Sequence, residues 1–261
     1  MWSALITGAG VLLGAFGAWS QTRAPDISEG ALQEAYAEHL KHVQTMLPSH
    51  SGPPPFVELS KDPNGGPARP DWVKRWDGIM GVRPHVDPGV SELWQATSTA
   101  TINTELVGPI WTLPAGNSDA VVIATPLSAS AHLSRDLRFV YSTFPLKLSK
   151  VLKGKSSGGF SPGGQILVAQ FGGTVRYPSG HEATFLMANE GFIGPGKQFL
   201  LFLSKPIRSE DLYVVLDAYL IENGRVFVVS SLTSERPYDG TPIQEFEKRV
   251  KSLIAENANS E

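Results

Sequence analysis

DAVVIATPLSAS, at residues 119–130, opens the stretch that decides the fold, which runs from Asp119 to Val229. The stretch holds short apolar runs rich in β-branched and aromatic residues, and Gly, Pro and Ser separate them. This pattern is typical of an all-β sandwich or barrel, and we interpret it as a small β-barrel. The remaining runs are LRFVYSTFPLKLSKVLKG (137–154), QILVAQF (165–171), GPGKQFLLFL (194–203) and LYVVLDAYLIENGRVFVVSS (212–231).

Three local features sharpen this prediction. Val121–Thr125 is an apolar run of the kind found in strands that are covered on both faces. Pro145 cannot donate a backbone hydrogen bond, so it indicates a bulge or an edge within the long run 137–154. Asn223-Gly224, between two apolar runs, predicts a tight hairpin. We therefore expect the barrel domain to occupy residues 93–240.

A helix is predicted on each side of the barrel. In the segment 21–47, Ser28 can cap an amphipathic helix that ends at Pro48. The segment 241–261 begins with the capping box Thr241-Pro242-Ile243-Gln244, and we expect its helix to pack on the barrel. The apolar stripes are Leu32, Tyr36, Leu40, Val43 and Leu47 in the first helix, and Ile243, Phe246, Val250, Leu253 and Ile254 in the second.

Residues 1–20 predict an apolar helix that serves as a signal peptide or a membrane anchor. No charged residue precedes Arg23, and about 18 apolar residues form a helix of about 27 Å, which reaches across a bilayer core. Ala18-Trp19-Ser20 fits cleavage before Gln21. We therefore expect an extracytoplasmic bacterial protein, periplasmic or secreted, which this segment anchors to the inner membrane if it is retained.

Residues 48–92 predict a linker and an irregular segment. SGPPPF (51–56) and KDPNGGPARP (61–70) are dense in Pro and Gly, which suit neither a helix nor a strand ladder. Four tryptophans nearby either anchor this part of the chain on a sheet or line a ligand platform. They are Trp72, Trp76, Trp94 and Trp111.

The composition excludes several classes of function. The 261-residue chain has a net charge of −3, so we predict no nucleic-acid partner. It has no cysteine, which excludes disulfides, thiolate metal ligands and a cysteine nucleophile. The GxxxxGK pattern at 191–197 leads into an apolar strand and not into a helix N-terminus, so it predicts a turn rather than a phosphate-binding loop. We expect no cofactor.

One pair of histidines has a spacing that could hold a metal ion. His39 and His42 lie three residues apart on the first predicted helix, with Glu38 beside them. No further ligand cluster follows at a useful distance. We therefore interpret the pair as part of a solvated helix face and predict no metal site.

The loop Phe171–Glu182 is the best candidate for a binding surface. Exposed loops on a rigid barrel commonly carry function, although a plain hairpin loop is the interpretation that we prefer for this segment. The candidate binding residues are Arg176, Tyr177, His181 and Glu182.

A hydrolase or a metal-dependent enzyme is the alternative function. Its candidate residues are scattered along the chain, so the hypothesis requires at least three of their side chains to converge. No G-x-S-x-G nucleophile elbow occurs, and Gly180-His181-Glu182 lacks the second histidine of a zinc-protease motif. We therefore predict no catalytic residues. The scattered candidates are His85, Asp87, His132, His181 and Glu182.

The order of motifs resembles that of netrin and TIMP-type modules and of secreted bacterial domains of unknown function. The matching positions are Val121–Thr125, Lys150–Gly154 and Gly196–Leu203, within about 110 residues. The resemblance implies an OB-like five-stranded barrel and an extracytoplasmic location. TIMP-type inhibitors act through an N-terminal cysteine, which this chain lacks, so neither that mechanism nor the disulfide framework carries over. The preferred function is an exported, non-catalytic module that binds a protein or a cell-envelope component.

Overall fold

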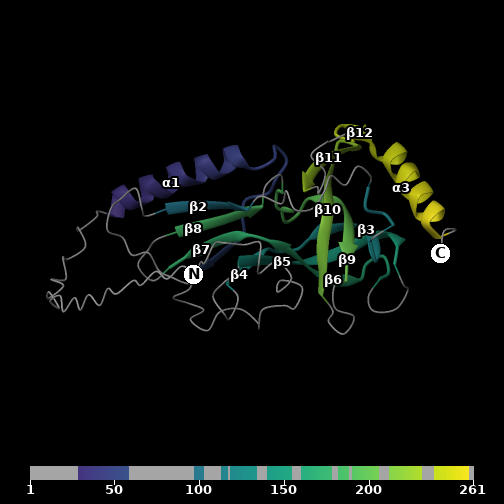
Figure 1. Cartoon of the computed structure of the whole chain (residues 1–261), viewed down its shortest axis with the longest axis horizontal. Coiled ribbons are helices and arrows are strands. Elements are labelled where there is room, and N and C mark those ends of the chain that lie inside the picture. The colour runs from purple at the N-terminus through teal and green to yellow at the C-terminus, as the bar shows by residue number, and fades with distance from the viewer. Residues whose placement is uncertain are drawn as a thin grey trace, which may run out of the picture.

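The computed structural model describes ten segments of the chain, and they form a mainly β fold (Figure 1). These segments are residues 29–58, 97–102, 113–116, 118–133, 140–154, 160–177, 182–187, 190–205, 212–230 and 238–258. Two helices, α1 (Glu29–Met46) and α3 (Ile243–Ala258), flank the strands. The strands are β1 (Phe56–Glu58), β2 (Thr97–Ile102), β3 (Ala120–Pro126), β4 (Ser130–Leu133), β5 (Val140–Lys153), β6 (Gln165–Phe171), β7 (Gly173–Arg176), β8 (Glu182–Met187), β9 (Gln198–Ser204), β10 (Leu212–Glu222), β11 (Arg225–Ser230) and β12 (Thr241–Pro242).

Five strands close into a barrel, which confirms the predicted OB-like barrel with flanking helices. The hydrogen-bonded order is β3, β5, β6, β10 and β9, and pairing between β9 and β3 closes the ring. The pairing of β6 with β10 is parallel, whereas the other four barrel pairings are antiparallel. Closure satisfies the backbone groups that an open sheet edge would expose.

The barrel strands β3 and β9 are buried on both faces, as the continuous apolar runs predict. Alternate residues point to opposite sides of a strand, so Val122 and Leu201 face the barrel interior while Val121 and Phe202 face outward. All four of these side chains are fully buried. The interior is filled from every barrel strand, by residues that include Ala120, Ala124, Phe144, Leu146, Leu148, Ile166, Val168, Phe199, Leu203, Val215 and Leu220.

The helix α3 covers one outer face of the barrel. Phe246 and Val250 of its apolar stripe are fully buried against β3, β9, β10 and β11. The helix begins at Ile243, and Pro242 belongs to the short strand β12. The proline therefore directly precedes the helix and is not its first residue. The amide of Ile243 donates a hydrogen bond to the carbonyl of Gly224 (2.9 Å), which ties the helix start to the β10–β11 hairpin.

A second, four-stranded sheet lies beside the barrel, and the sequence patterns did not indicate it. Its order is β1, β7, β8 and β2, with parallel pairing at both outer strands. The helix α1 runs along this sheet (Figure 1). Within the predicted linker 48–92, residues 48–58 are described, and they contain β1. Val43 of the predicted stripe is fully buried in the barrel core, with Leu47 packed beside it.

The predicted turns form at residues whose backbone preferences suit them. Asn223 and Gly224 both have positive φ angles, 51° and 73°, which is the backbone geometry of a tight hairpin between β10 and β11. Pro145 lies near the point where the partner of β5 changes, because β3 pairs as far as Leu146 and β4 pairs from Thr143 onward.

The predicted apolar helix at residues 1–20 and the cap at Ser28 lie outside the described residues. Within the described part of the chain, neither helix combines the length and the apolar character needed to cross a membrane.

Candidate functional site

Four apolar residues from four segments form one row across the outer surface of the barrel. Pro145 on β5 is paired with Leu167 on β6, and Leu167 is paired with Leu212 on β10. On the other side, the amide of Leu127 donates to the carbonyl of Pro145 (2.8 Å). Residues paired across a sheet point to the same face, so Leu127, Pro145, Leu167 and Leu212 share one face. We call these four residues the apolar row.

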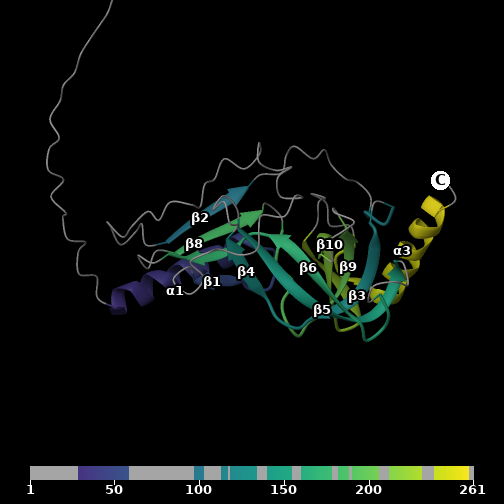
Figure 2. The same ribbon diagram turned by 90° about the horizontal axis from the view of Figure 1, so that it is seen from below.

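The apolar row is accessible to solvent. Leu127 is 49% exposed and Leu167 is 41% exposed, while Pro145 and Leu212 are half-buried. Leu127 and Leu167 are two of the four large apolar side chains that are exposed within the described part of the chain, and the other two, Met46 and Phe56, lie on separate elements. Figure 2 shows β4, β5 and β6 side by side on this surface. Neighbouring exposed apolar side chains often mark an interaction site.

A polar row borders the apolar row on one side. Lys147 on β5 is paired with Thr125 on β3 and with Gln165 on β6. Lys147 and Gln165 are exposed, and Lys147 forms no ion pair with any residue that the structure describes. The lysine therefore offers a positive charge next to the apolar row.

His132 lies beyond the apolar row on the opposite side. Its Nε2 is 2.8 Å from the hydroxyl oxygen of Thr143, and its ring stacks on Tyr141 with a centroid distance of 5.1 Å. Tyr141 is 1% exposed. The histidine is thus held by its neighbours on β5. It is paired with Tyr141, which points to the same face of β5 as Pro145.

The structure brings together two of the four predicted binding residues, Arg176 and Glu182. They face each other across the β7–β8 hairpin, and Nε of Arg176 donates to Oε1 of Glu182 at 2.8 Å. Glu182 is 4% exposed, and the guanidinium of Arg176 also lies 4.9 Å from the ring centroid of Phe56. The two charges therefore neutralise each other and join β1, β7 and β8.

The other two predicted binding residues are placed differently. Tyr177 is buried at 5% exposure and packs with Val175 and Phe185 between the small sheet and β5. His181 lies outside the described residues. The predicted loop is thus a hairpin with one ion pair at its base.

Two of the five scattered residues of the enzyme hypothesis lie within the described part of the chain, so the required convergence of three side chains stays a hypothesis. His132 is on β4 and stacks on β5, whereas Glu182 is on β8 and is paired with Arg176. His85, Asp87 and His181 lie outside the described residues. Within the described segments, no group of three or more His, Asp or Glu side chains has a geometry that could hold a metal ion.

The glycine-rich segment 191–197 forms a turn before a core strand, as predicted. Gly196 has a φ angle of 78°, and its amide donates to the carbonyl of Pro126 (2.9 Å). The strand β9 follows at Gln198, so the segment has no helix N-terminus to bind a phosphate.

One pair of carboxyl groups was missed by the sequence reasoning. Burial and, to a smaller extent, the neighbouring charge of Asp217 together raise the pKa of Glu190 from 4.5 to about 8. Asp217 is 1% exposed, on β10. The position of Asp217 inside the apolar run LYVVLDAYL was the sequence signal for a buried carboxyl group, because a charged residue in such a run is rarely solvated.

The fold and the site together define a small closed β-barrel with one helix-covered face and one accessible apolar face. No protein-family model matches the chain, and no curated protein matches its sequence.

Proposed function

We propose that the protein is an exported, non-catalytic binding module whose apolar row binds a protein or a cell-envelope component. The observation that carries this proposal is the exposure of Leu127 and Leu167 on either side of Pro145, on one face of the barrel. Covering apolar surface yields about 25 cal/mol per Å². Covering the exposed parts of two leucines therefore contributes about 2 to 3 kcal/mol, or roughly a hundredfold in affinity.

The position of the row within the barrel supports a binding role. β5 and β6 are the second and third barrel strands, and OB-folds use this face, with the first and fourth connecting loops, to bind ligands. Leu127 opens the first of these connections. The resemblance to netrin and TIMP-type modules and the uncharged segment 1–20 both support export.

The test is site-specific photo-crosslinking in the native host. A benzophenone side chain is introduced at Leu167 in one variant and at Met46 in another, since both positions are exposed to a similar degree. We expect a discrete crosslinked species for Leu167 in the extracytoplasmic fraction and none for Met46, and intact mass of the mature chain reports whether cleavage occurs before Gln21. Equal crosslinking from both positions, or a full-length soluble protein confined to the cytosol, would contradict the proposal.

A further inference from the structure

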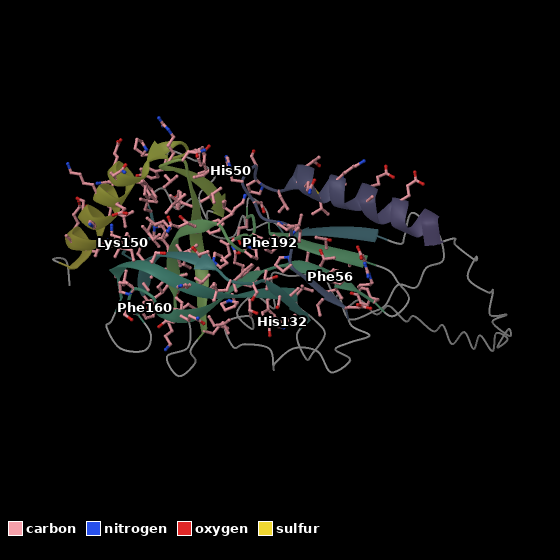
Figure 3. All side chains as sticks on the ribbon, turned by 180° about the vertical axis from the view of Figure 1, so that it is seen from behind. His50, Phe56, His132, Lys150, Phe160 and Phe192 are labelled. Carbon is pink, nitrogen blue, oxygen red and sulfur yellow. The ribbon has the colours of Figure 1, made fainter. Side chains whose placement is uncertain are left out.

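The barrel already binds one amphipathic helix of its own, α3, and the contact has two components. The apolar component consists of Phe246 and Val250, which are fully buried on the barrel surface. The charged component is an ion pair between Glu247 of α3 and Lys150 of β5, at 2.5 Å. Figure 3 places Lys150 next to α3.

The apolar row carries the same two components without a helix. Lys147 stands three residues before Lys150 on β5, and a register shift in the β3–β5 pairing lies between them. Residues three apart on a regular strand point to opposite faces, so the shift is what places both lysines on the outer surface. Lys150 is paired with Ile123 of the α3-covered face, and Lys147 borders the apolar row. Lys147 is exposed and forms no ion pair among the described residues.

The spacing of the row favours a helix over an extended segment. Adjacent strands are about 4.8 Å apart, so a row of four residues, three of them on adjacent strands and the fourth on the segment that follows β3, spans about 14 Å. Residues on one face of an α-helix recur every turn, about 5.4 Å, so four of them span about 16 Å. Alternate residues of an extended strand recur at about 6.7 Å and would span about 20 Å. The helix period is therefore the closer match.

We propose that the apolar row binds an amphipathic helix of a partner protein, with an acidic residue of that helix paired to Lys147. This inference rests on the proposed function and specifies the chemistry of the partner. The helix crosses β5, β6 and β10, and its apolar stripe covers Leu127 and Leu167. The contact repeats the arrangement of α3 on the other face of the barrel.

The test uses a peptide of known sequence, residues 240–258 of this chain, which contains α3. The peptide carries a fluorescein label and a hydrocarbon staple between positions 244 and 248, both exposed on the helix, so that it is helical in solution. Its binding to the full chain is measured by fluorescence anisotropy. We expect saturable binding that weakens at least tenfold in the double variant Leu127→Ser/Leu167→Ser and is unchanged in Met46→Ser.

Charge reversal tests the ion pair. Lys147→Glu should weaken binding several-fold, and a peptide with Glu247→Lys should restore it. Thermal melting of each variant verifies folding, since the substituted side chains are exposed and their loss should lower the melting temperature by only a few degrees.

Several results would overturn the inference. Absence of saturable binding would do so, as would equal binding by the double variant, which would place the peptide at another surface. A dimer in sedimentation that the double variant abolishes would identify a second copy as the occupant. Binding to vesicles with anionic lipids that depends on the two leucines would identify a membrane. Crosslinking at Leu167 without peptide binding would contradict the binding of a helix but would still support the proposed function.

Discussion

Two outer faces of the same barrel differ in what covers them. On one face, Val121 and Phe202 are fully buried beneath α3, whose Phe246 and Val250 are also fully buried. On the other face, Leu127 and Leu167 are 49% and 41% exposed. Both faces are apolar and both are bordered by a lysine of β5. Lys150 forms an ion pair with Glu247 of α3, whereas Lys147 forms none with the residues that the structure describes. The covered face therefore contributes to the stability of the fold, whereas the accessible face is the one for which we propose a binding role.

The largest expected effect separates the two faces by stability. Phe246→Ala leaves a cavity between α3 and the barrel, so the free energy of unfolding should fall by about 3 to 5 kcal/mol. Leu167→Ala removes a side chain that is 41% exposed and should lower it by less than about 1 kcal/mol. Urea denaturation followed by circular dichroism measures both values. Similar losses in the two variants would mean that the row is a structural part of the core.

The next effect concerns the carboxyl group of Glu190, whose surroundings contrast with those of the exposed Lys147. The raised pKa of Glu190 means that the folded state keeps a proton that the unfolded chain releases above pH 4.5. Its contribution to stability is therefore full below pH 4.5 and is lost as the pH rises toward 8. Glu190→Gln should remove this loss. At pH 8 the variant should be more stable than the wild type by about 1 to 3 kcal/mol, because Glu190 keeps partial contact with solvent, which screens part of the effect.

Urea denaturation at pH 4.5, 6.5 and 8 measures this difference. Asp217→Asn provides a matched control, since it removes the neighbouring charge that raises the pKa of Glu190. Asp217→Asn should reduce the change in the free energy of unfolding between pH 4.5 and 8 without abolishing it, because burial is the larger cause of the raised pKa of Glu190. A stability difference between Glu190→Gln and the wild type that does not change with pH would contradict the assignment.

The smallest effect distinguishes the two lysines. Lys150→Ala breaks the ion pair with Glu247, and exposed pairs of this kind contribute about 0.2 to 1 kcal/mol. Lys147→Ala should leave the free energy of unfolding unchanged within about 0.3 kcal/mol, because the side chain has no ion pair to lose among the described residues. Denaturation at low and high salt verifies this, since salt should reduce only the effect of Lys150→Ala. A larger loss for Lys147→Ala would assign that lysine a structural role.

The barrel was predictable because its signals are local. A continuous apolar run such as Val121–Thr125 indicates a doubly covered strand by itself, and Asn223-Gly224 specifies its turn through two positive φ angles. The stripe of α3 is equally local, since residues three and four apart share a helix face.

The second sheet was not predictable for the opposite reason. Its outer strands β1 and β2 are parallel to partners more than eighty residues away, with Phe56 opposite Thr174 and Thr97 opposite Glu182. β1 has three residues, too few for a recognisable alternation. Such strands form only when a distant partner is already in place.

The candidate binding residues show the same limit. Arg176 and Glu182 are polar residues near a turn, which the sequence cannot distinguish from a ligand-binding loop. Pairing of β7 with β8 places their side chains opposite each other and turns them into an ion pair. Ligand binding by these two residues therefore stays a prediction, and the structure gives both of them a structural role in joining β7 to β8.

By itself, the sequence determined the five barrel strands, the hairpin turn and the amphipathic helix at the C-terminus, because these depend on neighbours a few residues apart. Only the tertiary structure decided which apolar face remained accessible. Leu127, Pro145, Leu167 and Leu212 belong to four separate segments, and none of them is unusual in its local context. They become a row because strand pairing sets their register, and they stay exposed because α3 packs on the other face.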